Sequence, residues 1–557
     1  MKVIAAICVD FERSPLGGAS RLGEGLAGRR VIDHALSRFA RVAGADERWM
    51  VVPPEQAEAA TRVIAECGVS IRVAPIAQAT PRRRLIEIIR KCSLESWRGG
   101  PMNGTWFDEF VEPFALARLL ESAGADAAFL CEGHQAALDP ALASAQIAAI
   151  RERAEAAMIF SPAPPGLGGI VLQPSAVETL TSHNLTVGIL LTYRPEFPNT
   201  DPLIHSTCLH VDPDIAATTG RFCADTRRGM ERLSLLFEQC GVEADSAALT
   251  AAHRRLFDRA VETLPREVEL ELTTDTLAPR SKLRPPLAGE SKRRLDDRGA
   301  LAARLAELAA YDDARLTLVG CGDPLRHPRF AEIAAQIGGA GIFATTLVSP
   351  LHELSDEQLA ALGSGSFDFV EVPIDATSRA TYAAIHGVDL FDPVLANIER
   401  IEQQRRDTRN PRPVLVPTFT RCAANAHEMD AFYDHWIQRV GSAVIRGYNE
   451  FAGALPADTL LHAASPVRRS CGRLWSRMTL LADGRAVRCE QDFQGASAIG
   501  DWRSSSLTDL WRGAAMSELR GVHRSLDVLS NGAPLTQSTR PLATLSMCNA
   551  CREWFRP

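Results

Sequence analysis

Four cysteines in the C-terminal part of the chain constrain its fold and chemistry more than any other feature. They are Cys471, Cys489, Cys548 and Cys551, and only two residues separate the last two. Such a close pair can hold one face of a metal centre, while Cys471 and Cys489 supply the other face. Because thiolates are soft ligands, this set predicts either an iron–sulfur cluster or a tetrahedral zinc ion.

Local sequence signals explain how these cysteines come together. Apolar residues flank the dipeptide Asp483-Gly484, which suits the positive φ angles of a tight hairpin turn. The hairpin would return Cys489 to Cys471. A helix is then predicted from the capping hydroxyl of Ser506 to Gly521, because apolar residues recur there at helical spacing.

The order of these motifs resembles the SPASM/twitch module that follows many radical S-adenosylmethionine domains. The motifs are Cys471, Gly484-x4-Cys489, Leu507-x2-Leu510-Trp511 and Cys548-x2-Cys551. Full SPASM modules carry more cysteines and hold two auxiliary clusters, whereas this chain has enough for one. The resemblance implies one [4Fe–4S] cluster on Cys471, Cys489, Cys548 and Cys551, with zinc as the alternative.

The middle of the chain alternates short β-branched runs with helical patterns. The predicted strands are 268–272, 315–319, 341–346, 369–374, 413–417 and 443–446, and helices such as 298–310 and 430–440 lie between them. Six such units predict a parallel sheet curled into a barrel or part of one. Ligands of barrels gather where the strands end at their carboxyl side.

One strand end carries the segment Gly320-Cys321-Gly322-Asp323-Pro324. With Asp375 and His386-Gly387 further on, it resembles the partial barrel of radical S-adenosylmethionine enzymes. In that family a Gly-x-Gly-Glu-Pro loop meets the amino group of the cofactor, so the resemblance implies a degenerate S-adenosylmethionine loop at Gly320, Gly322, Asp323 and Pro324. Asp323 stands here in place of Glu.

The first strand of this domain lacks the family's catalytic equipment. The family follows that strand with Cys-x3-Cys-x2-Cys, whose thiolates hold the cluster that cleaves the cofactor. The three positions fall here on Thr276, Arg280 and Leu283. None of these side chains can replace a thiolate, so we expect that S-adenosylmethionine is not cleaved.

The N-terminal part begins with a buried strand and a glycine-rich loop that contains Gly17, Gly18 and Arg21. Glycines after a strand let backbone N–H groups approach phosphate. With the strand that ends at Glu132 and with Asp225, this loop resembles the cytidylyltransferases of surface-sugar synthesis, which implies a Rossmann-like fold and a nucleotide loop at Gly17, Gly18 and Arg21. The family's phosphate-binding Lys and metal-binding Gly-Asp are both absent.

These patterns together predict an α/β protein of three domains. They are a nucleotidyltransferase-like domain at 1–262, a degenerate radical S-adenosylmethionine partial barrel at 263–462, and a small α+β SPASM module at 463–557. The net charge of −7 among 557 residues suggests no nucleic-acid partner, and no apolar run is long enough to cross a membrane. Thirteen cysteines without an export signal predict a reducing cytoplasm.

Three functions fit this organisation. The preferred one is an iron–sulfur protein without radical chemistry, which acts in electron transfer, as a scaffold, or in binding a redox or enzyme partner. The second is a nucleotidyltransferase that uses Arg21, Glu132 and Asp225. The third is a protein that binds a nucleoside or S-adenosylmethionine at Gly322-Asp323-Pro324 without cleaving it.

Overall fold

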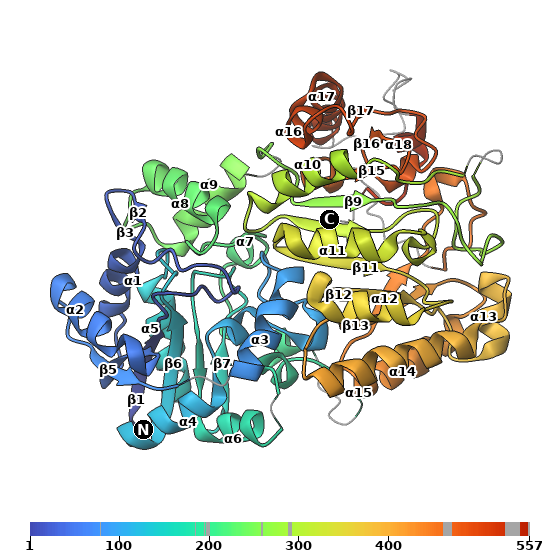
Figure 1. Ribbon diagram of the computed structural model, residues 1–557. Helices are drawn as coiled ribbons and strands as arrows, with labels where there is room; N and C mark the ends of the chain where they lie inside the picture. Colours follow the sequence, from blue (N-terminus) through green and yellow to red (C-terminus); the bar gives the residue numbers. More distant parts are fainter. Residues whose placement is uncertain are drawn as a thin grey trace. The chain divides into compact units, whose positions relative to one another are not determined.

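A computed structural model describes residues 1–77, 80–183, 185–193, 195, 201–257, 260–287, 292–460, 470–529 and 546–554. The chain forms two compact units, 1–258 and 259–557. Each unit has a sheet with buried strands and helices around it (Figure 1). In the described part of the chain, no helix is both long enough and apolar enough to cross a bilayer.

The first unit is built on a six-stranded sheet in the order β5-β4-β1-β6-β8-β7. Its strands are β1 (Val3–Cys8), β4 (Glu47–Val52), β5 (Arg72–Pro75), β6 (Ala127–Glu132), β7 (Met158–Phe160) and β8 (Ile170–Leu172). β1 pairs in parallel with both β4 and β6, whereas β8 runs antiparallel to β6 and β7. A small hairpin, β2 (Gly25–Leu26) and β3 (Arg29–Arg30), stands apart from this sheet.

Helices of this unit supply the apolar cover for both faces of the sheet. They are α1 (Val31–Ala40), α2 (Ala57–Cys67), α3 (Thr80–Ile89), α4 (Pro113–Ala123), α5 (Pro140–Glu152), α6 (Pro174–His183), α7 (Pro213–Ala216), α8 (Arg227–Cys240) and α9 (Ser246–Phe257). Alternate residues of β1 belong to different apolar clusters: Val3 and Ile7 to one, Ile4 and Ala6 to the other. A strand buried on both sides explains the unbroken apolar run of the sequence.

The second unit has a nine-stranded sheet in the order β14-β13-β12-β11-β10-β9-β15-β16-β17. The six strands predicted for the barrel are present as β9 (Glu267–Leu270), β10 (Arg315–Leu318), β11 (Ala344–Val348), β12 (Phe369–Pro373), β13 (Val414–Arg421) and β14 (Val444–Gly447). All are parallel to their neighbours. The prediction of an α/β protein with parallel sheets is therefore confirmed.

The strands of the cysteine-rich tail continue this sheet. They are β15 (Arg477–Leu480), β16 (Arg485–Val487) and β17 (Gly500–Asp501). β15 pairs in parallel with β9, with Arg477 opposite Glu267 and Leu480 opposite Leu270. Figure 1 shows β15 beside β9, although about 200 residues of chain separate them. One buried apolar cluster includes side chains of both strands, so the tail and the parallel strands of this unit share a core.

The helices α10 to α15 of the second unit lie between its parallel strands along the chain, and α16 to α18 follow the last strand. They are α10 (Arg298–Ala309), α11 (Phe330–Ala340), α12 (Asp356–Ala361), α13 (Arg379–His386), α14 (Phe391–Thr408), α15 (Met429–Val440), α16 (Leu507–Arg512), α17 (Ala514–Leu529) and α18 (Ser546–Ala550). The single helix predicted from Ser506 to Gly521 is wrong in two respects, because it breaks at Gly513 and continues past Gly521. A Cβ at Gly513 would lie 2.6 Å from the carbonyl oxygen of Asp509, so the break requires glycine.

Candidate metal centre

All four cysteines of the tail line one pocket of the second unit. Cys471 precedes the short helix Gly472–Trp475, and Cys489 follows β16 and precedes the short helix Glu490–Asp492. Cys548 lies in α18 and Cys551 directly after it. The structure thus brings together the residues that the sequence singled out. Within the described residues, no three His, Cys, Asp or Glu side chains are already arranged as a metal-holding group.

The hairpin β15–β16 sets the position of Cys489 relative to Cys471. Its turn contains Gly484, whose φ is +99°, and a Cβ there would lie 2.1 Å from Nε of Arg503. The backbone N–H of Cys471 donates to Nδ1 of His523 at 3.4 Å. Glycine therefore permits the turn of the hairpin, and histidine on α17 holds the segment that precedes it.

Burial raises the pKa of these thiols. It does so for Cys471 and Cys489, and it raises the pKa of Cys551 to about 11. The guanidinium of Arg473 acts in the opposite sense on all three thiols, and so do backbone N–H groups. One of these, the N–H of Glu553, donates to Sγ of Cys551 at 3.3 Å. Such donors and a nearby cation favour the thiolate, which is the form that binds metal.

Buried polar atoms at the pocket also suit a charged occupant. Arg473 is ion-paired with Glu490. Nε of Arg488 and Oε1 of Gln491 are buried and make no hydrogen bond to any described residue. Because unsatisfied buried polar atoms are costly, a polar group in this pocket would stabilise the module. The donor set of four thiols fits a soft metal centre.

Residues 471–552 match the iron–sulfur cluster-binding domain called SPASM. This match includes all four cysteines that line the pocket and confirms the iron–sulfur domain predicted for the tail. The sequence is also 27% identical over 309 residues to an uncharacterized protein of Treponema pallidum (strain Nichols), which corresponds to 52% of this chain and 85% of that protein.

Several solved structures share a distant likeness with parts of the chain. SuiB of Streptococcus suis bound to S-adenosylmethionine has a TM-score of 0.40 and 14% identity, over 53% of this chain and 80% of that one. BtrN in complex with AdoMet and 2-DOIA has a TM-score of 0.31 and 14% identity, over 48% and 90%. A cytidylyltransferase of Leptospira borgpetersenii has a TM-score of 0.32 and 12% identity, over 46% and 94%. Likeness at this level carries no conclusion about activity.

The glycine-rich loop Gly320–Pro324 follows β10 and packs tightly on the segment after β9. A Cβ at Gly320 would lie 2.6 Å from Cγ of Glu271, and one at Gly322 would lie 2.4 Å from the carbonyl oxygen of Thr273. Asp323 precedes Pro324 and is 2% exposed. Its carboxylate accepts hydrogen bonds from the Ser349 hydroxyl at 2.8 Å and from the backbone N–H of Leu325. The predicted loop residues are therefore adjacent, and Asp323 has internal partners.

The segment that replaces the three cysteines of the family is packed against the rest of the unit. Leu283 joins a small apolar cluster with Ile385, Cys422 and Tyr448. The backbone of Arg280 lies against Gly387. Cys321 is buried, and burial raises the pKa of its thiol to about 12. The segment at the positions of the family's cysteines is therefore packed against other residues of the second unit.

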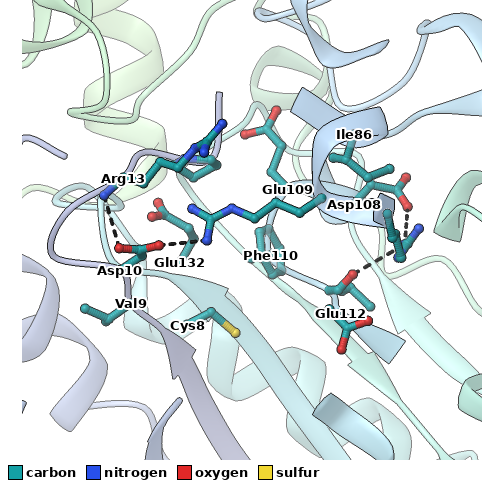
Figure 2. Close-up of a pocket in the computed structure, with 14 residues that line it drawn as sticks. Cys8, Val9, Asp10, Arg13, Ile86, Asp108, Glu109, Phe110, Glu112 and Glu132 are labelled. Carbon is teal, nitrogen blue, oxygen red and sulfur yellow. Dashed lines mark hydrogen bonds and ion pairs between the residues drawn. The ribbon is translucent and has the colours of Figure 1, made fainter. Parts of the chain in front are cut away.

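The first unit has its own pocket at the carboxyl ends of β1 and β6. Asp10, Arg13 and Glu132 lie together on one side of it (Figure 2). The charged side chains at the mouth of the pocket are largely paired with one another. Arg83 binds Asp10 at 2.7 Å, and Arg13 binds Glu87 at 2.7 Å. This pocket lies at the edge of a parallel sheet where ligands commonly bind.

Of the residues predicted for a nucleotide site, only Glu132 lines this pocket. Arg21 is paired with Glu24 at 2.8 Å, and Asp225 forms a buried ion pair with Arg221. A Cβ at Gly17 would lie 3.2 Å from a carboxylate oxygen of Glu87, and Gly18 follows it in the same loop. Glu132 is joined through His134 to the backbone N–H of Arg21, and the nucleotide site at Arg21, Glu132 and Asp225 stays a prediction.

Sequence reasoning missed the arginines of the metal centre. Arg473 and Arg488 line the pocket with the cysteines. Each lies within two positions of a predicted ligand, which was the available signal. A basic residue beside a cysteine is nonetheless too common to identify a site without knowledge of where its side chain points.

Proposed function

We propose that the protein holds one [4Fe–4S] cluster on Cys471, Cys489, Cys548 and Cys551 and uses it for electron transfer. The observation that carries this proposal is that all four cysteines of the matched domain line the same pocket. Four protein thiolates leave no iron open for a substrate. This arrangement favours electron transfer or structural support over substrate activation.

The chain's own residues perform three tasks at this site. The cysteines bind the cluster, which supplies one-electron transfer when it is bound. Arg473 and the N–H of Glu553 favour the thiolate form of the ligands. Apolar and aromatic side chains such as Leu474 and Trp554 exclude water from the pocket.

The barrel is proposed not to perform radical chemistry. Thr276, Arg280 and Leu283 occupy the three positions where the resembling family has its cluster cysteines. Incubation of the reduced protein with S-adenosylmethionine is expected to release no 5′-deoxyadenosine. Release of that product on reduction would overturn this part of the proposal.

Electron transfer implies a partner. We propose a small redox protein or an enzyme that exchanges one electron with the tail module. A cluster without an open iron binds no substrate, so its electron must pass to or from another molecule. Nucleotide transfer by the first unit is the weaker alternative, since Arg21 and Asp225 are held in ion pairs. Pyrophosphate release from CTP with a sugar substrate would favour that alternative.

Metal and sulfide analysis of anaerobically purified protein tests the main proposal. We expect about four irons and four sulfides per chain, with a broad absorbance band at about 400 nm that dithionite bleaches. Stoichiometric zinc without sulfide would replace the cluster with a zinc site. About eight irons would mean that a second cluster exists, and the proposal that the barrel holds none would be wrong.

A further inference from the structure

One arginine of the cysteine pocket is buried without a carboxylate partner. Arg488 lies between β16 and Cys489, lines the pocket and is 5% exposed. Its Nε makes no hydrogen bond, and within the described residues no ion pair reaches its guanidinium. Glu553 also lines the pocket. A buried charge of this kind is rare and costly unless an anion faces it.

Two neighbouring arginines of the same module have partners among the described residues, although each also has a buried nitrogen without a hydrogen bond. Arg473 is paired with Glu490. Arg520 donates to the carbonyl oxygens of Leu474 and Trp511, and its guanidinium lies 4.1 Å from the centre of the Trp511 ring. Arg488 has neither arrangement. It lines the same pocket as the four cysteines.

We propose that Arg488 is the counter-cation of the cysteine-held centre and raises its reduction potential. The inference rests on the proposed function. A core of charge +2 on four thiolates has a net charge of about −2, and one electron from a reductant makes it about −3 without any change in bonding or protonation. A nearby buried cation stabilises the more negative state more strongly, because the Coulomb energy grows with charge and is weakly screened in the interior. Arg488 therefore acts as a positioning residue for charge and touches no substrate.

The test compares the midpoint potential of the wild-type protein with those of three variants, using dithionite titration under argon. In R488Q the reduction equilibrium at a fixed potential is expected to shift about ten-fold towards the oxidised form, which corresponds to a midpoint about 59 mV lower. R488K keeps the charge and is expected to stay close to wild type.

R503Q is the matched control. Arg503 belongs to the same module, is 46% exposed and pairs with Asp501, so its loss changes the net charge equally but at the surface. Solvent and salt screen such a charge, and no shift is expected. Equal potentials in R488Q and wild type would overturn the inference. Equal shifts in R488Q and R503Q would overturn it too.

Cluster content separates the remaining outcomes. Loss of iron from R488Q but not from R488K would support a requirement for positive charge. Loss from both variants would assign Arg488 to packing and overturn the inference. Wild-type protein without iron would refute the proposed function itself, and the metal analysis reports this before any potential is measured.

Discussion

The carboxylate of Glu271 and the guanidinium of Arg293 form a buried bidentate ion pair, with Nε–Oε2 at 2.8 Å and Nη2–Oε1 at 2.9 Å. Glu271 follows β9, and it also accepts the backbone N–H groups of Cys321 and Ala482 at 3.2 Å. One carboxylate therefore connects the loop after β10 with the hairpin of the tail. Loss of this carboxylate should loosen both.

We expect E271Q to lower the free energy of unfolding by about 3–5 kcal/mol, because Arg293 would remain as a buried, unpaired charge. Urea unfolding followed by tryptophan fluorescence measures this change. E332Q is the control, since Glu332 pairs with Arg298 where both side chains are half exposed, and it should cost at most about 1 kcal/mol. Equal costs for the two variants would contradict the structural role of the Glu271–Arg293 pair.

The buried carboxyl of Asp323 should make stability depend on pH. Burial raises its pKa from 3.8 to about 6, against the opposing hydrogen bonds of Ser349 and Leu325. The folded state thus holds this proton more tightly than the unfolded state does. The resulting contribution to stability is complete below about pH 4 and is lost as the pH rises through about 6.

The rise in the pKa of Asp323 from 3.8 to about 6 corresponds to about 3 kcal/mol of stability. We expect D323N to lack this contribution, so that the difference in unfolding free energy between wild type and variant changes by about this amount between pH 4 and pH 7. Urea unfolding at several pH values measures it. A difference that stays constant with pH would show that Asp323 does not titrate in this range.

Each cysteine of the centre should be needed for iron. We expect C471S, C489S and C551S to retain less than about half of the wild-type iron and sulfide, because a serine hydroxyl is a harder and less acidic ligand than a thiol. C240S is the control, since Cys240 is half-buried in the first unit and lies outside the pocket. Wild-type iron content in all three pocket variants would refute the assignment of ligands.

Asp225 should support the first unit rather than hold a catalytic metal. Its carboxylate pairs with Arg221, which also binds Glu109 at 2.6 Å, and all three are buried. D225N is expected to lower the unfolding free energy of this unit by about 3 kcal/mol. E243Q, at the exposed pair with Arg41, is expected to change it by less than about 1 kcal/mol. A fully stable D225N protein would reopen a catalytic role.

The sequence by itself determined the features that depend on local pattern. Unbroken apolar runs located β1 and β6, and the alternation of strands and helices gave the six parallel strands of the second unit. The spacing of Cys471, Cys489, Cys548 and Cys551 identified the tail domain, whereas the loss of a three-cysteine cage at Thr276, Arg280 and Leu283 stays a prediction. The physical reason is that period and spacing are set by neighbours along the chain.

Only the tertiary structure decided which distant segments meet. The pairing of β15 with β9 joins the tail to the parallel strands of the second unit, and Glu271 reaches Ala482 across that junction. The fold placed Arg488 in the pocket with the cysteines and brought the Ser349 hydroxyl to the carboxylate of Asp323. These relationships follow from long-range packing and from the low dielectric of the interior. The residues next to each site in the sequence determine neither the packing nor the dielectric.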